Sequence, residues 1–299
     1  MKKLKVLLAV LLLIMGVSIT AHAATAAETV VALGADLSAQ QRSTVLELMG
    51  LTEEDLLECT VVTITNEMEH QYLDAYIDSS VIGTKSLSSV VLRKAEKGHG
   101  VLVTTKNINY CTTGMYRNAL LTAGLEDTDV LVVGPSKISG TAALIGAVKA
   151  YEQMSGESVS DQILDTAMDE LITTGKLAEG ENSEVVEELI AFVKAKLAAG
   201  ELDTDEDIAE AIREGEEKFQ ISLTEEEKDK ILQVMHKIKE LGLDPEQILE
   251  QAKDLYKQFG DDLLNNAEAA VKETVKSSVA NYFSDFGNRI KEFVLNIFS

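Results

Sequence analysis

The 299-residue sequence has no tryptophan, only two cysteines and far fewer basic than acidic residues. Its 27 lysines and arginines are outnumbered by 50 aspartates and glutamates, which gives a formal net charge of −23 at pH 7. An anionic surface of this kind repels nucleic acid and anionic lipid, because both carry negative phosphate groups. The composition therefore argues against a nucleic-acid partner and favours a protein that its charge keeps in solution.

Familiar catalytic motifs are also missing. The sequence contains no Gly-x-Ser-x-Gly nucleophile elbow, no His-Glu-x-x-His zinc helix and no Ser-x-x-Lys pair. Two cysteines without neighbouring histidines do not build a structural zinc site. We therefore expect no cofactor and no metal centre, and a role without catalysis is favoured.

One acidic stretch imitates a calcium loop. Asp203, Asp205 and Asp207 alternate along the chain as calcium ligands do. Glu214 stands at the twelfth position, but Ile208 occupies the place of the glycine that makes the sharp turn. The stretch is therefore interpreted as a helix, and only weak, diffuse binding of divalent cations by the acidic surface is expected.

Long apolar runs are scarce, and the longest lies at the N-terminus. Three early lysines precede the apolar run Leu7–Val17, and Ala21-His22-Ala23 supplies small residues where a signal peptidase cleaves. The run is short for a bilayer span of about 20 residues, so residues 1–24 are predicted to be a cleaved signal peptide. A retained anchor is the alternative. Cleavage makes the charge about −26, because it removes three lysines and no acid.

The two cysteines, Cys59 and Cys111, leave two alternatives open. Outside the cytoplasm an even pair of cysteines can form a disulfide. Such a bridge would stabilise the fold by about 4 kcal/mol in the chain-entropy description. Otherwise the two residues are buried free thiols that behave as small apolar groups.

Residues 25–157 alternate strand and helix patterns, which predicts an α/β domain with helices packed on a mixed sheet. The turn Lys97-Gly98-His99-Gly100 predicts a hairpin between the third and fourth strands. The expected strands are Thr29–Leu33, Thr60–Thr65, Ser88–Arg93, Val101–Asn107 and Val130–Val133, and the expected helices begin at Ser38, Glu67, Thr113 and Ser139.

Residues 158–299 show no strand pattern and predict an acidic, all-helical region. Apolar residues recur at helical spacing, and Thr224 to Glu227 form a capping box at the start of one helix. A further helix is expected from Asp244-Pro245. The amphipathic stripe Phe286–Ile297 is expected to dock onto the other helices rather than onto a membrane.

Six groups of residues in the α/β part carry a family resemblance. They are Ala32–Leu37; Thr65-Asn66-Glu67 with Tyr72-Leu73; Ile82-Gly83-Thr84 with Ser88-Ser89-Val90; Asn107-Ile108 with Met115-Tyr116; Asn118–Gly124; and Ser139–Leu144. Together they resemble the YpuA-like exported proteins of Gram-positive bacteria, a family classed as a domain of unknown function. The resemblance implies an exported protein at the surface of a Gram-positive cell, and it brings no activity or site residues.

The segment Gly134–Thr141 follows a buried strand and opens a helix, which makes it the first candidate site. Free backbone amides and the helix dipole meet at such a place and suit an anion. Lys137 adds a positive charge, Ser139 and Thr141 add hydroxyls, and Ser136 and Gly140 complete the expected ligand-binding residues. The alternative is an ordinary turn in which Ser139 is the N-cap.

A second set of polar residues follows another strand. Asn66 and Glu67 come directly after Thr60–Thr65. If the two strands are parallel neighbours, both segments lie at one edge of the sheet, where open α/β sheets bind ligands. The alternative is a helix cap at Asn66 with Glu67 favoured by the helix dipole.

Two functions follow from these observations. The first is a non-enzymatic extracytoplasmic protein that acts as a binding or scaffold module at the cell surface or wall, with a protein or cell-envelope partner. The alternative is a small-molecule or anion-binding protein, possibly an enzyme, that uses Gly134–Thr141.

Overall fold

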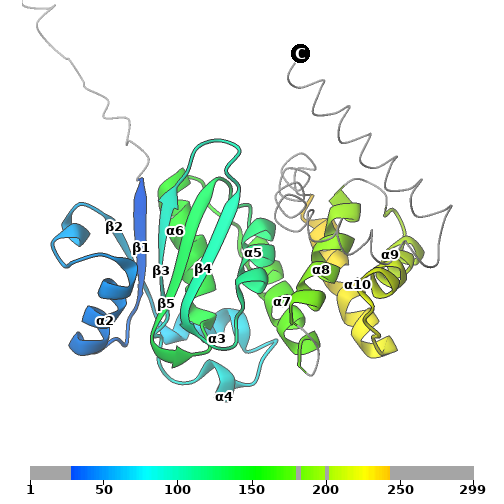
Figure 1. Cartoon of the computed structure of the whole chain (residues 1–299), viewed down its shortest axis with the longest axis horizontal. Helices are drawn as coiled ribbons and strands as arrows, with labels where there is room; N and C mark the ends of the chain where they lie inside the picture. Colours follow the sequence, from blue (N-terminus) through cyan, green and yellow to red (C-terminus); the bar gives the residue numbers. More distant parts are fainter. Residues whose placement is uncertain (1–27, 180–182, 199–201, 243–299) are drawn as a thin grey trace, which may run out of the picture.

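A computed structural model describes residues 28–179, 183–198 and 202–242 of the chain. The predicted signal peptide, the helix expected from Asp244-Pro245 and the stripe Phe286–Ile297 lie outside the described residues. The centre of the fold is a five-stranded sheet in the order β2-β1-β3-β5-β4 (Figure 1). The strands are β1 (Thr29–Gly34), β2 (Thr60–Ile64), β3 (Ser89–Lys94), β4 (Val101–Ile108) and β5 (Thr128–Ile138).

The sheet is mixed, as the sequence predicts. Strands β1 and β2 are parallel, β4 and β5 are parallel, and β3 runs antiparallel to both of its neighbours, β1 and β5. A single reversed strand therefore stands between two parallel pairs. It follows that β1, β2, β4 and β5 all end at the same edge of the sheet.

The predicted hairpin between β3 and β4 is wrong. The turn at Lys97–Gly100 exists, but β5 lies between the two strands and pairs with both. The Asp127 carboxylate accepts hydrogen bonds from the amides of Gly98 (2.9 Å) and Gly100 (3.0 Å), which ties the turn to the start of β5. Val130–Val133 is almost wholly apolar, and a central position buries such a strand on both faces. This burial outweighs the local preference for a hairpin.

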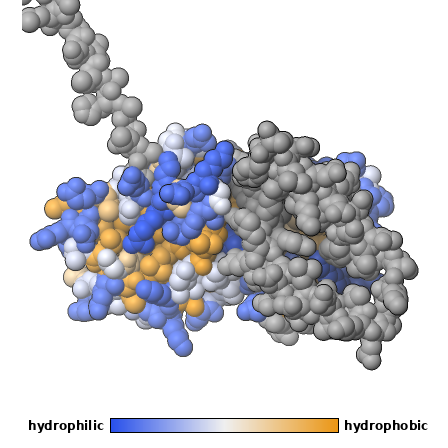
Figure 2. All heavy atoms as spheres, turned by 45° about the horizontal axis from the view of Figure 1, so that its top comes forward, coloured by the Kyte–Doolittle hydropathy of each residue, from blue (hydrophilic) through white to orange (hydrophobic). Residues whose placement is uncertain are grey.

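One face of the sheet carries α2 (Ala39–Met49) and the short 3-10 helix η1 (Asp55–Leu57). The α2 helix has no basic residue in its last turn, and the sheet supplies the missing charge. Lys106 Nζ donates to the Leu48 carbonyl at 2.7 Å and the Arg93 guanidinium to the Met49 carbonyl at 3.2 Å. Cations at a helix C-terminus stabilise it. The α2 and η1 helices cover only part of this face of the sheet. Leu102 on β4 remains 41% exposed there. Figure 2 shows apolar side chains at the surface of the α/β half.

The opposite face is buried under several helices, and the larger core lies there. The first helix after the expected boundary at residue 157 shares this core, since Leu164, Met168 and Leu171 on it are completely buried there. The α/β part and the helical part therefore meet along one continuous apolar core. The helices are α3 (Asn66–Leu73), α4 (Ser79–Ile82), α5 (Thr113–Thr122), α6 (Thr141–Ser155) and α7 (Asp161–Leu177).

The rest of the described chain is helical, as the sequence predicts. Its helices lie beyond α5 and α7 in Figure 1 and surround a second apolar core that includes Ile190, Ile212 and Val234. They are α8 (Ser183–Ala198), α9 (Asp205–Phe219) and α10 (Glu225–Glu240).

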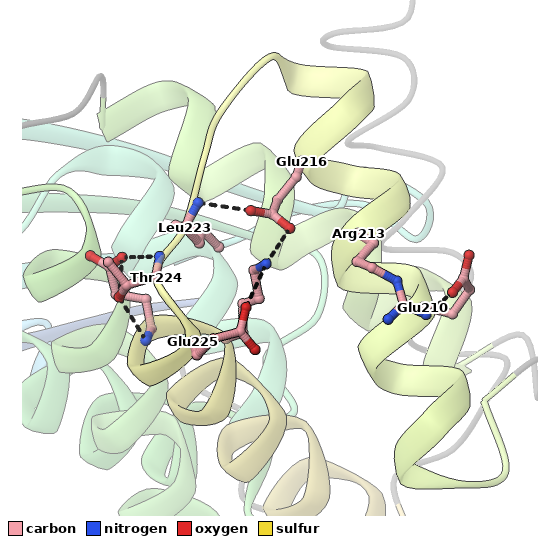
Figure 3. A network of polar contacts seen from close by, with 8 residues as sticks. Glu210, Arg213, Glu216, Leu223, Thr224 and Glu225 are labelled. Carbon is pink, nitrogen blue, oxygen red and sulfur yellow. Dashed lines mark hydrogen bonds and ion pairs between the residues drawn. The ribbon is translucent and has the colours of Figure 1, made fainter.

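Polar contacts join α9 to α10 (Figure 3). Glu216 accepts a hydrogen bond from the Leu223 amide at 2.7 Å and forms an ion pair with Lys228 at 3.1 Å. The predicted capping box is present, because Thr224 accepts from the Glu227 amide while the Glu227 carboxylate accepts from the Thr224 amide. The turn between the two helices is therefore fixed by its own side chains.

The segment that imitates a calcium loop is helical. Thr204 is the N-cap, and α9 begins at Asp205. The Asp207 carboxylate accepts from the Thr204 amide at 2.8 Å and from the Asp203 amide at 3.1 Å. These acids therefore stabilise the start of a helix, where the dipole favours negative charge.

Candidate functional site

A pocket of about 320 Å³ opens at the edge of the sheet where the four like-directed strands end. Its two walls are residues 81–88, which lead from α4 into β3, and Ile138–Thr141, which join β5 to α6. This edge is where α/β sheets commonly bind their ligands. The volume lies at the small end of the range for ligand sites.

The pocket contains only part of the first candidate site. Ser139, Gly140 and Thr141 line it. Ser136 and Lys137 do not: they belong to β5, which continues to Ile138 instead of ending at Val133, and of this strand the pocket is lined by Ile138 alone. The expected loop is therefore mostly strand.

An irregularity in β4 explains why β5 is longer than predicted. Asn107 has a positive φ of 60° and shifts the register, after which Ile108 pairs with Ile138. Its side-chain amide donates to the Gly134 carbonyl at 3.1 Å. The longer strand moves the helix start forward, so that the N-cap of α6 is Gly140, at a φ of 97°, and Ser139 does not take that role.

The second candidate site contributes through a residue that the sequence analysis missed. Asn66 lies in the first turn of α3, behind Thr65 as the N-cap, and Glu67 is exposed and outside the pocket lining. Glu69 lines the pocket and is only 2% exposed. Its spacing of four residues from the fully buried Leu73 places both on one face of α3, which was the available signal.

The Glu69 carboxylate is held by hydrogen bonds alone. Thr141 Oγ1 donates to Oε1 at 2.8 Å, and Asn66 Nδ2 lies 3.5 Å from Oε2. Burial raises the pKa of this carboxyl, and the hydrogen bonds from Thr141, Asn66 and Ser86 oppose the rise. No lysine, arginine or histidine among the described residues forms an ion pair with it.

The pocket wall at residues 81–88 and the start of β3 at Ser89 are attached to β1 by hydrogen bonds. The Ser86 amide donates to Asp36 Oδ2 at 2.8 Å, and the Asp36 amide donates to the Ser86 carbonyl at 3.1 Å. The Gly34 amide donates to Ser89 Oγ at 3.1 Å. A Cβ on Gly34 would lie 2.3 Å from the Ser86 carbonyl oxygen, so this approach requires glycine.

The same wall is also fastened to α3 and α6. His70 Nε2 lies 3.1 Å from the Gly83 carbonyl, while its Nδ1 lies 2.7 Å from Asp74 Oδ1. These two acceptors raise the pKa of His70, with the Asp74 bond as the larger cause. The Ala143 amide in the first turn of α6 donates to Ser88 Oγ at 3.0 Å. The pocket wall is thus built into the fold on three sides.

The thiols of the chain are free and lie in different cores. Cys111 is buried on the side of α5 and α6, whereas Cys59 packs with the core under α2, on the other face of the sheet. The structure contains no bridge between them; Cys111 is a buried thiol, whereas Cys59 is half-buried. Burial raises the pKa of Cys111 to about 12, so its thiol is not an activated nucleophile.

Three of the segments that carry the family resemblance meet at this pocket. Gly34 and Asp36 hold one wall, Gly83 and Thr84 form part of it, and Ser139–Thr141 form the other. These segments are far apart in the sequence, and the fold brings them to one edge of the sheet.

Two absences hold for the part of the chain that the structure describes. No group of three or more His, Cys, Asp or Glu side chains within it is arranged to hold a metal ion. None of its helices is long and apolar enough to cross a membrane.

Comparison with known proteins agrees with the resemblance. Residues 33–255 match the profile of the family described as "Protein of unknown function (DUF1002)". The chain is 37% identical over 265 residues to "Uncharacterized protein YpuA" of Bacillus subtilis (strain 168), and the match covers 87% of this chain and 90% of the relative. No solved structure matches. The chain therefore belongs to the DUF1002 family, together with YpuA.

Proposed function

We propose that this chain is a non-enzymatic extracytoplasmic binding protein that holds a small polar group in the pocket between residues 81–88 and Ile138–Thr141. The observation that carries the proposal is the pocket itself. It combines apolar walls with the Glu69 carboxyl and the Ser139 and Thr141 side chains, which is the usual make-up of a ligand site.

The contacts of the pocket favour binding over catalysis. Ser139 Oγ lies 3.4 Å from Thr141 Oγ1, and Thr141 donates in turn to Glu69. An activated serine instead needs a general base within hydrogen-bond reach of its own hydroxyl. The Cys111 thiol is buried with a pKa raised to about 12, which leaves the thiolate scarce at neutral pH.

An anion-binding role at the same segment is less well supported by the contacts. The Ala143 amide, one of the free donors at the start of α6, is already bonded to Ser88 Oγ. The Glu69 carboxyl faces the same space and repels an anion when it is charged. The positive charge expected from Lys137 lies on β5 outside the pocket.

The proposed partner is a component of the cell envelope. The N-terminal segment has the pattern of an export signal, and a net charge of −23 keeps the protein soluble and apart from anionic polymers. Divalent cations bound weakly and diffusely to this acidic surface would overcome the repulsion and bridge the protein to such anionic polymers. N-terminal sequencing of the native protein tests export, because material that begins at Met1 in the cytosol would contradict it.

The test of the pocket is a blocking substitution. Thr84 is exposed and lines the pocket, so Thr84→Trp would obstruct it, whereas Thr104→Trp makes the same change at an exposed position outside the lining. Both variants would be used to retain components from a cell-envelope extract. We expect Thr84→Trp to lose what the native protein and Thr104→Trp retain. Equal retention by all three proteins would remove the pocket from the function.

A further inference from the structure

No cation within the described residues forms an ion pair with the Glu69 carboxyl, although the neighbouring His70 favours its charged form. Glu69 is 2% exposed, and its hydrogen bonds come from the neutral side chains of Thr141 and Asn66. Glu170, another acid buried to this degree among the described residues, is 1% exposed and forms an ion pair with Lys194 at 2.9 Å. A carboxylate removed from water without a partner is unfavourable, because nothing replaces its hydration.

The position of Glu69 allows a ligand to supply this cation. Glu69 is one of the residues that line the pocket, so a group bound there lies next to it. A carboxylate accepts about four hydrogen bonds in all. Oε1 receives one good bond from Thr141, whereas the contact of Oε2 with Asn66 is long, at 3.5 Å, and the contribution of Ser86 is smaller still. At least one strong acceptor position is therefore left unused.

We infer that the group held in this pocket is a primary ammonium, such as that of an amino sugar, an amino-acid ester or a peptide amino terminus. The inference rests on the proposed function and names its ligand class. An ammonium carries three donors in a tetrahedral arrangement, and the Glu69 carboxylate and the nearby Ser139 and Thr141 oxygens are acceptors. The opposite charges of carboxylate and ammonium make the central bond a strong one.

A metal ion fits this place poorly. Calcium takes six to eight oxygen ligands and magnesium a near-ideal octahedron, usually with more than one carboxylate. Within the described residues, no group of three or more His, Cys, Asp or Glu side chains is placed to hold a metal ion. The net charge of −23 nevertheless attracts cations to the protein, and an ammonium needs a single carboxylate.

Other charged groups near Glu69 set the conditions of the test. On α3, His70 favours the charged form of Glu69, and Lys85 in the pocket wall is exposed to solvent. From the β4–α5 side, Cys111 and Tyr116 lie close enough for Glu69 to raise their pKa values, so both stay neutral. Glu69 is therefore the acid in the lining whose protonation binding would change.

This arrangement predicts how binding depends on pH. In the empty pocket burial raises the pKa of Glu69, and a bound ammonium lowers it again. Binding therefore releases a proton, and affinity rises with pH until Glu69 is charged without ligand. An α-ammonium loses its own proton near pH 8, so binding is measured at a series of pH values from the ordinary glutamate value of 4.5 up to about pH 7.

The experiment compares two probes that differ in a single group. Alaninamide carries an ammonium where lactamide carries a neutral hydroxyl, and inorganic phosphate tests the anion alternative. Titration calorimetry with the full chain, in buffers of different ionisation enthalpy, gives affinity and proton release together. We expect alaninamide to bind with release of a proton, and lactamide and phosphate to bind at least about tenfold more weakly.

Substitutions at Glu69 complete the test. Glu69→Gln removes the charge and keeps the shape, and should weaken alaninamide binding by about tenfold or more and abolish the proton release. Glu69→Asp retains the charge and should keep the preference for alaninamide over lactamide at reduced affinity. Circular dichroism and thermal melting establish that both variants fold.

The failure of this inference differs from the failure of the proposed function. A neutral or anionic compound whose binding is blocked by Thr84→Trp but unchanged by Glu69→Gln would keep the pocket and overturn the ammonium. Absence of alaninamide binding, or equal affinity for lactamide, would overturn it as well. An envelope component retained equally by Thr84→Trp and the native protein would instead contradict the proposed function.

Discussion

Two regions of this protein each bury a glutamate, and they treat it differently. At the junction of α5, α7 and α8, Glu170 is bound by Lys194 and by Thr122, whose hydroxyl donates at 2.5 Å. Lys194 also donates to the Asn118 carbonyl at 2.6 Å. At the edge of the sheet, Glu69 is bound by neutral groups and lines a pocket.

The comparison separates two uses of a buried charge. A carboxylate whose partner comes from the same chain contributes to holding two parts of the fold in one arrangement. A carboxylate that is buried without a partner and borders an open space weakens the empty protein, and its charge is available to a ligand. A buried ion pair within the chain therefore indicates a structural role, whereas a buried carboxylate without an ion pair beside a pocket indicates a ligand-binding role.

The largest expected effect is that of breaking the pair. Lys194→Met leaves Glu170 buried without its cation, and such a change costs about 3–5 kcal/mol of unfolding free energy. Urea denaturation measures the loss. The double variant Glu170→Leu with Lys194→Met should recover a large part of it, because an apolar pair needs no charge partner. A double variant as unstable as Lys194→Met would show that the pair is not the reason.

A second substitution should disturb only the wall of the pocket that contacts β1. Gly34→Ala places a Cβ 2.3 Å from the Ser86 carbonyl oxygen, so the wall must move, at about 1–3 kcal/mol. Amide exchange should accelerate in residues 83–89 and stay unchanged around Lys194. Gly146→Ala is the matched control, because its nearest contact is 3.1 Å away and involves the Ala32 side chain. Equal destabilisation by both changes would contradict the account of the wall.

Removal of the unpaired charge should have a smaller effect that depends on pH. The folded-state pKa of Glu69 is raised, so the native chain binds a proton more tightly than the unfolded chain does. The free energy of unfolding therefore falls as the pH rises from the ordinary glutamate pKa of 4.5 through the raised folded-state pKa. Glu69→Gln should therefore gain stability relative to the native protein above the ordinary glutamate value of 4.5. Thermal melts at a series of pH values measure it. A difference that is independent of pH would contradict the raised pKa.

The last expected result is that chemical reduction does not change the stability of the protein. Because Cys59 and Cys111 are free and lie in cores on opposite faces of the sheet, a reducing agent should leave the melting temperature unchanged. Mass spectrometry after alkylation under denaturing conditions should find both thiols modified without prior reduction. A shift of the melting temperature on reduction would indicate a bridge that this structure does not contain.

Local patterns predicted most of the elements but not the order of the strands. The existence of the strands, the capping box at Thr224 and the change from α/β to helical structure follow from periodicity and capping residues within short windows, whereas the expected caps at Asn66 and Ser139 are one residue off. The place of β5 between β3 and β4 does not, because it depends on how much apolar surface each arrangement buries across the whole sheet. The turn at Lys97–Gly100 has the local signature of a hairpin and serves another connection.

The sequence indicated the edge of the sheet at which the candidate site lies, but not the full set of residues that line the pocket. Polar residues that follow strands are brought to one edge, which pointed to Ser139–Thr141 in the lining of the pocket and to Asn66, which lies beside Glu69 but outside the lining. Glu69 was missed, since a glutamate inside a helix is usually exposed and only the fold shows that it points inward. The extension of β5 that excluded Lys137 depends on the irregularity at Asn107, which short-range patterns do not reveal.

The strand order also constrains when the fold can form during synthesis. β5 is the last strand in the chain, yet it joins β3 to β4 in the middle of the sheet. A nascent chain that stops before Thr128 holds three paired strands with β3 as an open edge, and a fourth strand with no neighbour. Open edges of this kind attract other chains. The chain must therefore be available as far as Ile138, wherever it folds, before the edges of β3 and β4 are protected from aggregation.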